Sequence, residues 1–374
     1  MYKIRKVESR KDLKIFIKFP FELYKDNPNW VPPLLMDELT VLDPKKNPAF
    51  EHCKATLWLV ENDAGKVVGR VAGIIHEGES REHQLVRFGW IEFIDDREVS
   101  KLLLDTVMRW GKSYGLTGIH GPMGFTDMDF EGMLVEGFDT PGTIATIYNH
   151  PYYPEHLEAL GFEKGTDWVE LRSTVPDEAP QRVVRRGDIV ESRFKFKSLK
   201  FKNKGEAKKY GKEIFNVLND AYAKLYGFQQ LTDKQIQFYI GQYLGFVVTD
   251  LISVVTNKDG KVIGFAITMP SLTKAFQKAK GRLFPFGFLH ILNAVRKNDT
   301  ADMYLIGVLP SYQKFGVTAI IFRDLIQAFV KRGIKTAITN QMLADNQNIL
   351  TQFNEFQSNS EIYKRRRAYK RNIA

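Results

Sequence analysis

The feature that most constrains the fold of this chain is an internal repeat. Residues 62–74 (NDAGKVVGRVAGI) recur without a gap as residues 257–269 (NKDGKVIGFAITM), and the two copies begin 195 residues apart. Each copy predicts a β-hairpin, because two apolar strands flank a tight turn whose glycine, Gly65 or Gly260, can adopt positive φ. A spacing of this size fits a whole domain and is too long for a solenoid unit. The sequence therefore predicts two similar domains in tandem.

The segments that follow the hairpin have the same order in both halves. In the first half an extended apolar segment at 87–94 precedes an amphipathic helix that we expect to end at Gly115. In the second half a strand at 303–308 precedes a helix at 317–332 that Gly333 ends. Both halves are therefore expected to be mixed α/β domains.

The domain boundaries are expected where the composition becomes polar. The run TVPDEAPQ begins at Thr174 and contains two prolines, which favours a connection over a helix or strand. We expect a first domain at 1–173, a linker at 174–189 and a second domain at 190–374.

Composition limits the partners and the compartment. The 54 basic and 44 acidic side chains give a net charge of +10, which favours cofactor phosphates, nucleic acid or an anionic membrane, or is a basic surface with no such partner. Cys53 is the one cysteine, which excludes an internal disulfide and a cysteine-based metal cluster and favours a reducing cytoplasm. The seven histidines show no metal-ligand spacing, so we expect no metal site. We also expect no secretory leader and no spanning helix.

The strongest local signal lies between Ile306 and Thr318. A strand ends, Pro310 prevents further ladder pairing, and a short loop with Gly316 leads directly into an amphipathic helix. The unpaired N–H groups and the dipole at the start of such a helix suit a pyrophosphate. The alternative is that Gly316 only shapes the entry to a packed helix.

This segment resembles the acyl-CoA-binding motif of the GNAT superfamily of N-acyltransferases. The strand, Val-x-Pro, Gln-x-x-Gly-x-Thr and the helix follow the duplicated hairpin in that family's order, and the resemblance extends over both halves to a group of tandem bacterial proteins. It implies an α/β fold of two tandem GNAT-like domains and a site for acetyl-CoA or a longer acyl-CoA. The strand residues implied for the acyl-pantetheine arm are Ile306, Gly307 and Val308, and those implied for the pyrophosphate are Gln313, Lys314, Phe315, Gly316, Val317 and Thr318. Asn346 matches an asparagine of the family, whereas Thr318 stands where a smaller residue is usual.

Two departures from the family pattern matter. At the equivalent loop, residues 93–100 contain no glycine and three acids, which would repel a pyrophosphate, so the first half is expected to be a degenerate domain that serves as a scaffold or acceptor site. In the second half Phe353 stands where many relatives have a tyrosine that protonates the leaving thiolate, and a phenyl ring cannot donate a proton. The family's Gly-Phe after that helix is replaced by Gln357 and Ser358.

The family implies direct transfer, in which a neutral amine attacks the thioester carbonyl and strand N–H groups near Val308 stabilise the oxyanion. A base must accept the proton of the amine, and Asp345, Asp302 and Tyr304 lie near the expected site. Each of the three is also an ordinary residue of a turn or strand, so the sequence does not identify the base.

Two further segments are candidates for the acceptor. Asn149, Tyr152 and Tyr153 form a polar and aromatic cluster that opens a helix, where Asn149 could cap the helix or the cluster could bind an acceptor. The segment 271–298 has no counterpart in the first half, and Phe284, Phe286 and Phe288 lie there between cations. It could contact an anionic membrane, form a tunnel for an acyl or lipid chain, or be a lid packed on the core.

Three functional hypotheses follow. The first is an acyl-CoA-dependent N-acyltransferase of the cytoplasm that acts on a small-molecule or lipid amine, with possible peripheral contact at the inner membrane face. The second is a tRNA-dependent aminoacyl transferase of the peptidoglycan-bridge type, and the third is a non-catalytic ligand- or membrane-binding protein. The basic and aromatic tail at 363–371 could contact nucleic acid or form a closing strand.

Overall fold

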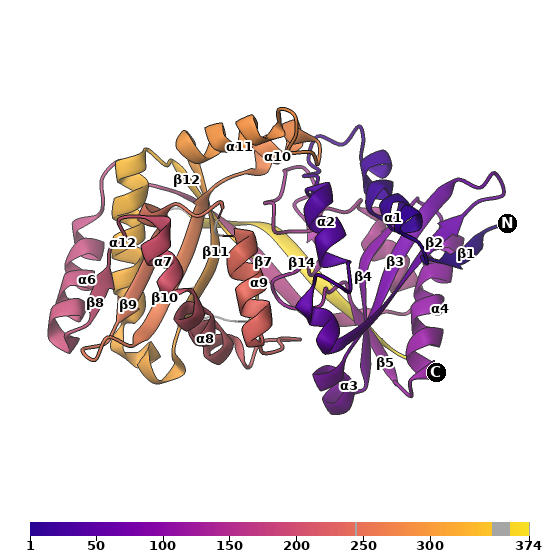
Figure 1. Ribbon diagram of the computed structural model, residues 1–374, viewed down its shortest axis with the longest axis horizontal. Coiled ribbons are helices and arrows are strands. Elements are labelled where there is room, and N and C mark those ends of the chain that lie inside the picture. Colours follow the sequence, from indigo (N-terminus) through magenta and orange to yellow (C-terminus); the bar gives the residue numbers. More distant parts are fainter. Residues whose placement is uncertain (244, 346–359, 374) are drawn as a thin grey trace. The chain divides into compact units, whose positions relative to one another are not determined.

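The computed structural model describes residues 1–243, 245–345 and 360–373. The chain forms two compact units (Figure 1). Unit 1 consists of Met1–Val169, Thr273–Phe288 and Lys364–Ala374, and unit 2 consists of Glu170–Leu272 and Leu289–Tyr363. Both units are mixed α/β, which confirms the expected fold class. The units are not contiguous in sequence, unlike the expected ranges 1–173 and 190–374.

Unit 1 is built on a mixed sheet with the strand order β1-β2-β3-β4-β5-β14. Its strands are β1 (Lys3–Lys6), β2 (Cys53–Glu61), β3 (Val67–His76), β4 (Leu85–Phe93), β5 (Gly118–Gly121) and the last part of β14 (Ser360–Asn372), which also pairs with β6 (Met133–Glu136). Its helices are α1 (Arg10–Leu23), α2 (Leu35–Val41), α3 (Glu77–His83), α4 (Arg97–Ser113), α5 (Tyr152–Ala159) and α10 (Thr273–Ala279), with a 3₁₀ turn η1 (Pro48–Glu51). Within this sheet β4 and β5 are parallel, and the other neighbours are antiparallel.

Unit 2 has a sheet with the strand order β7-β12-β11-β10-β9-β8. Its strands are the last part of β7 (Glu163–Thr174), β8 (Lys197–Leu199), β9 (Ile252–Thr256), β10 (Val262–Pro270), β11 (Thr300–Val308), β12 (Thr336–Thr339) and β13 (Met342–Leu343). Its helices are α6 (Gln181–Phe194), α7 (Lys204–Lys209), α8 (Gly211–Tyr222), α9 (Asp233–Tyr243) and α12 (Val317–Arg332), with 3₁₀ turns η2 (Thr249–Leu251) and η3 (Pro310–Phe315). Helix α11 (Gly287–Arg296) begins in unit 1 and continues into unit 2.

The repeated hairpins are β2–β3 and β9–β10, and they pack in the same way in the two units. Their turn glycines have φ of 70° at Gly65 and 82° at Gly260. A Cβ added at Gly69 would lie 2.8 Å from Val99 in α4, and one added at the repeat-equivalent Gly264 would lie 2.7 Å from Val317 in α12. These glycines therefore allow α4 and α12 to lie directly on equivalent strands.

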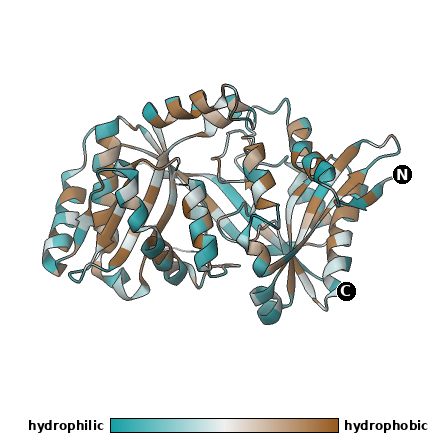
Figure 2. Cartoon of the chain, in the orientation of Figure 1, coloured by the Kyte–Doolittle hydropathy of each residue, from teal (hydrophilic) through white to brown (hydrophobic). Residues whose placement is uncertain are grey.

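The opposite face of each sheet is covered by the helix that precedes the hairpin. In unit 1, Arg70 follows Gly69 and donates a hydrogen bond of 2.9 Å to the carbonyl of Phe16 in α1. In unit 2, a Cβ at Gly307 would lie 3.5 Å from Ala221 in α8. Because successive strand residues point to opposite faces, each sheet lies between two layers of helix. Figure 2, in the orientation of Figure 1, shows mainly hydrophobic residues along β3 and β10, mainly hydrophilic residues along β14, and a hydrophilic α3.

The expected linker between the halves needs correction. Helix α6 begins at Gln181, so residues 181–189 of the expected linker are helical. Val183 of α6 is buried, and a Cβ at Gly187 would lie 2.8 Å from Arg323 of α12. The apolar spacing of this segment was hidden by its many charges, and packing on α12 decides its conformation.

The segment 271–298 is not a single insertion in the second half, because it is divided between the two units. Its first part belongs to unit 1, where Thr273 Oγ1 donates to the carbonyl of Gly142 (3.0 Å) and the carbonyl of Gly281 accepts from Leu35 N (3.0 Å). Phe284 and Phe286 follow with 76% and 68% of their surface exposed. The lid hypothesis therefore fits the first part of the segment and does not fit these two aromatic side chains.

The tail forms the long strand β14, which confirms the closing-strand hypothesis. Lys364 and Arg366 are buried, and Lys364 Nζ donates to the carbonyl of Thr140 (2.6 Å). Arg367 forms an ion pair with Asp167 (2.8 Å). These cations are held within unit 1, so the tail gives no support to nucleic-acid contact. Among the described helices, none is long and apolar enough to cross a membrane.

Candidate functional site

The first candidate site is the place in unit 2 where β11 separates from β12. The two parallel strands pair from Thr300 with Thr336 to Met303 with Thr339, and Asn340 N donates to the carbonyl of Met303 (2.9 Å) just beyond the last pair. Strand β11 then continues to Val308, paired only with β10 among the described strands. Among the described residues, one edge of residues 304–308 therefore has no strand partner, although the carbonyls of Ile306 and Val308 accept from the Tyr222 hydroxyl (3.0 Å) and the Gln313 amide (3.4 Å).

A β-bulge lies at the point of separation. Leu305 pairs with Ile267 and Met303 pairs with Thr268, so Tyr304 is the extra residue of β11. The hydroxyl of Tyr304 and Oδ1 of Asn340 are buried and have no hydrogen-bond partner among the described residues. Orphaned polar atoms at an open strand edge are the kind of groups that a ligand satisfies.

Burial shifts the pKa of the two candidate catalytic residues on β11, Tyr304 and Asp302. Burial, and then the charge of Asp302, raises the pKa of Tyr304 well above its ordinary value, so the phenol stays neutral. Burial raises the pKa of Asp302 to about 7, although a hydrogen bond from Ser271 acts in the opposite direction. Asp345 is exposed and lies in a turn after β13.

The loop after β11 brings most of the predicted cofactor residues together. Residues 310–315 form η3, Gly316 has φ of 74°, and α12 begins at Val317 with no side-chain cap. Gln313, Lys314 and Phe315 are exposed, while Val317 is buried. The first N–H groups of a helix have no acceptor inside the helix, so this uncapped start suits an anion. Asn346, Phe353, Gln357 and Ser358 lie outside the described residues.

The equivalent loop of unit 1 is closed by its own carboxylates. Asp96 is the N-cap of α4, accepts from Glu98 N (2.8 Å) and also accepts from the hydroxyl of Tyr2 (2.7 Å). Asp95 lies 3.0 Å from the ring of His156. The positive end of α4 is therefore already satisfied, in support of the expectation that this half has lost its phosphate site.

The strand pairing identifies a candidate site residue that the sequence analysis missed. In unit 1 Gly69 pairs with Phe93, and in unit 2 its repeat equivalent Gly264 pairs with Val308. The preceding residues, Glu92 and Gly307, therefore occupy equivalent positions. Glu92 could have been found by extending the repeat across to the next strand.

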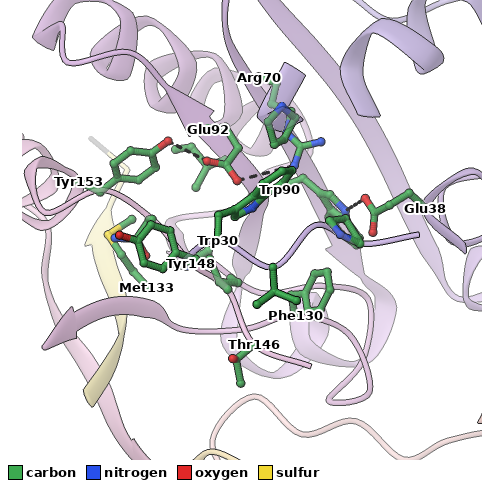
Figure 3. Close-up of a pocket in the computed structure, with 17 residues that line it drawn as sticks. Trp30, Glu38, Arg70, Trp90, Glu92, Phe130, Met133, Thr146, Tyr148 and Tyr153 are labelled. Carbon is green, nitrogen blue, oxygen red and sulfur yellow. Dashed lines mark hydrogen bonds and ion pairs between the residues drawn. The ribbon is translucent and has the colours of Figure 1, made fainter. Parts of the chain in front are cut away.

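Glu92 lies in a pocket of unit 1 that encloses about 690 Å³, its open mouth included (Figure 3). Oε2 of Glu92 accepts from the hydroxyls of Tyr153 (2.8 Å) and Tyr24, and Oε1 lies 3.8 Å from a terminal nitrogen of Arg70. Glu38 accepts from the indole nitrogen of Trp90 (3.0 Å). The other lining residues are Pro20, Trp30, Val31, Pro33, Ile91, Pro122, Phe130, Met133, Thr146, Ile147, Tyr148 and Asn149.

The charges of this pocket are buried and mutually dependent. Burial raises the pKa of Glu92, and the charge of Arg70 and the two tyrosine hydroxyls act in the opposite direction. Burial also raises the pKa of Glu38, again opposed by Arg70. Burial raises the pKa of Tyr24 and of Tyr153 well above the ordinary value, so both phenols are neutral donors.

Comparison with known proteins agrees with this geometry. No family model matches the chain. Protein YghO of Escherichia coli (strain K12) is 29% identical over 99% of this chain and 95% of its own length. Bacterial ceramide synthase of Caulobacter vibrioides is 29% identical over 82% of this chain and 80% of its own length.

A tandem GNAT protein from the clavulanic acid biosynthesis pathway superposes on the whole chain with a TM-score of 0.58 at 10% identity, and 99% of that structure is covered. This chain has the tandem GNAT fold. A GCN5-related N-acetyltransferase from Sphaerobacter thermophilus also matches the whole of this chain, over 96% of its own length. The TM-score is 0.51 and the identity is 10%. The expected double GNAT-like architecture is thereby confirmed.

The three predicted acceptor residues near α5 have different contacts in the structure. Asn149 does not cap α5, whose N-cap is Pro151; its amide is buried and bonds both N (2.7 Å) and O (3.0 Å) of Leu134 in β6. The capping hypothesis is wrong, because the buried Asn149 amide instead pairs with both backbone groups of Leu134, as a neighbouring strand would. Asn149 and Tyr153 line the pocket of unit 1, whereas the hydroxyl of Tyr152 donates to the carbonyl of Phe93 (2.6 Å).

Phe284, Phe286 and Phe288 do not line this pocket. Phe284 and Phe286 are exposed, and Phe288 is half-buried. Among the described residues, no group of three or more His, Cys, Asp or Glu side chains could hold a metal ion.

Proposed function

We propose that this protein is an acyl-CoA-dependent N-acyltransferase that acts on a small-molecule or lipid amine. The observation that carries the proposal is the uncapped, glycine-bearing start of α12 directly after the separated end of β11. In this proposal the backbone N–H groups at 313–318 hold the pyrophosphate of acetyl-CoA or a longer acyl-CoA. The edge of β11 at 306–308, which has no strand partner among the described residues, holds the acyl-pantetheine arm.

The residues around the bulge of β11 supply the proton chemistry of the proposal. The cofactor supplies an activated thioester; the amine forms the new C–N bond as the C–S bond breaks. Asp302, with a pKa of about 7, is suited to accept the proton of the amine near neutral pH. Tyr304 keeps its proton, so its neutral hydroxyl could donate a hydrogen bond to the departing thiolate, which takes up a proton from solvent.

The acceptor class rests on one relative and one surface. The name of the relative from Caulobacter vibrioides, bacterial ceramide synthase, supports a lipid amine as the acceptor here. Exposed Phe284 and Phe286 follow exposed Lys280 and Arg282 closely in the chain, a combination that supports peripheral contact with an anionic membrane. In this proposal the protein works in the cytoplasm, at the inner membrane face.

The test is a Gly316→Glu variant, with Gly333→Glu as the matched control. Both glycines flank α12 with φ of 74° and 70°, so both substitutions add the same backbone strain and the same negative charge. Calorimetric titration with acetyl-CoA and with palmitoyl-CoA should show one site per chain in the wild type. Gly316→Glu should weaken binding at least tenfold through charge repulsion and the altered turn, whereas Gly333→Glu should bind like the wild type.

Equal binding by the two variants would contradict the placement of the donor site. Two sites per chain would contradict the assignment of unit 1 as a degenerate domain. Circular dichroism of both variants checks that the loss of binding is not a loss of folding.

A further inference from the structure

The pocket of unit 1 combines an aromatic wall with more buried acidic than basic side chains. Among its lining residues, Glu38 and Glu92 are acids and Arg70 is the one base. Each of these side chains is less than a tenth exposed. Arg70 can balance one carboxylate, so a second carboxylate in the pocket has no counter-charge from the lining.

Burial disfavours the ionised form of both pocket acids, and Arg70 only partly opposes this, so the pKa of Glu92 and of Glu38 is raised. A cationic ligand beside these carboxyl groups would supply the missing counter-charge and stabilise the ionised form.

The wall of the pocket suits an ammonium group. Trp30, Trp90 and Tyr148 line it, and the rings of Tyr24 and Trp30 stack at 5.3 Å. Aromatic faces beside a carboxylate attract ammonium groups through the ring quadrupole and the charge together. Figure 3 shows Glu92 and the labelled aromatic side chains around the same space.

One buried donor of the pocket also lacks a partner. Arg70 uses one terminal nitrogen for the carbonyl of Phe16 and the other for Glu92, and its Nε is buried with no hydrogen-bond partner among the described residues. A ligand oxygen could accept from this nitrogen. Phe130, Met133 and Ile147 add apolar surface that suits a hydrocarbon chain.

We propose that this pocket binds a protonated primary amine that carries an apolar chain and a hydroxyl or carbonyl oxygen close to the nitrogen. Glu92 contacts the ammonium group, Arg70 donates to the oxygen, and the aromatic wall covers the chain. The inference rests on unit 1 alone and does not require acyl transfer.

The experiment is a titration with short amphiphiles followed by tryptophan fluorescence. All five tryptophans belong to unit 1, and Trp30 and Trp90 line the pocket. The probes are 2-amino-1-octanol, octylamine, octanol and octanoate at pH 7.5. We expect the amino alcohol to bind most tightly, octylamine next, and octanol and octanoate at least tenfold more weakly than octylamine.

Glu92→Gln should reduce the affinity for both amines at least tenfold and leave the affinity for octanol unchanged. Glu158→Gln is the matched control, because Glu158 also accepts from a tyrosine hydroxyl in unit 1 (Tyr369, 2.9 Å) but does not line the pocket. Glu38→Gln provides a second test of the charge if Glu92→Gln does not fold.

Equal affinity for octanol and octylamine would overturn the proposal, as would tighter binding of octanoate or unchanged amine binding by both pocket variants. Gly316→Glu should bind the amines like the wild type. A protein that binds amines but no acyl-CoA would keep this inference and refute the proposed function, so the two can fail separately.

Discussion

Replacement of Asp302 by asparagine should change how the stability of unit 2 depends on pH. Asp302 is 2% exposed on β11, and burial raises its pKa to about 7 from the ordinary 3.8. An acid whose pKa is raised by folding takes up protons in the folded state, so the wild type loses stability as the pH rises from about 4 to about 7. Asparagine has nearly the same shape and does not titrate.

The magnitude follows from the size of the shift. At about 1.4 kcal/mol per pH unit, the ionised form of Asp302 costs about 4 kcal/mol above pH 7, and somewhat under half of this cost is already present at pH 5. The free energy of unfolding of Asp302→Asn relative to the wild type should therefore rise by about 3 kcal/mol between pH 5 and pH 8.

Urea unfolding at pH 5, 6, 7 and 8 measures this difference. Far-UV circular dichroism follows both units, whereas tryptophan fluorescence follows unit 1, because all five tryptophans lie there. The change should appear in the circular dichroism transition and not in the fluorescence transition.

Asp167→Asn is a suitable control. Burial raises the pKa of Asp167, but its hydrogen bond and ion pair with Arg367 outweigh burial and lower the pKa below 3.8. Its contribution is fully present above that value, so this variant should show a deficit that is constant from pH 5 to pH 8. If the difference in unfolding free energy between Asp302→Asn and the wild type stayed constant or fell as the pH rises, Asp302 would not be a carboxyl group that burial keeps neutral.

Two further expectations concern surface contact and covalent chemistry. The double variant Phe284→Ser with Phe286→Ser should no longer float with anionic liposomes, while its binding of acyl-CoA stays intact. A salt concentration of 0.5 M, roughly fivefold above the ionic strength at which the screening length is about 10 Å, should weaken liposome binding by the wild type. Wild-type protein that does not bind liposomes would contradict membrane contact. Burial raises the pKa of the Cys53 thiol to about 12, so the native protein should react slowly with a thiol reagent at pH 8. Cys53→Ser should bind acyl-CoA normally, and mass spectrometry should find no covalent acyl adduct in the wild type or in this variant. An acylated Cys53 would contradict direct transfer.

Local signals in the sequence were sufficient for several elements. The hairpin repeat predicted equivalent strands, and the structure adds that Gly69 and Gly264 accept helices in the same way. The helix from Val317 to Arg332 has the predicted bounds, because the positive φ of Gly316 and Gly333 stops it at both ends. The acids at the start of α4 predicted a loop that repels phosphate; Asp96 of this loop caps the helix, and the loss of phosphate binding stays a prediction.

The sequence by itself determined the duplicated α/β architecture, the tight turns and the place where a phosphate could sit, because each of these depends on residues close together in the chain. The tertiary structure decided the rest. Tyr24 is the C-cap of α1, and Arg70, Glu92 and Tyr153 belong to β3, β4 and α5; nothing in their local sequence indicates that they meet. The role of Asn149 and the place of the last residues of β14 beside β5 also depend on partners distant in sequence. Pairing and burial between distant segments set these positions and the protonation of their acids, and such contacts exist only once the chain is folded.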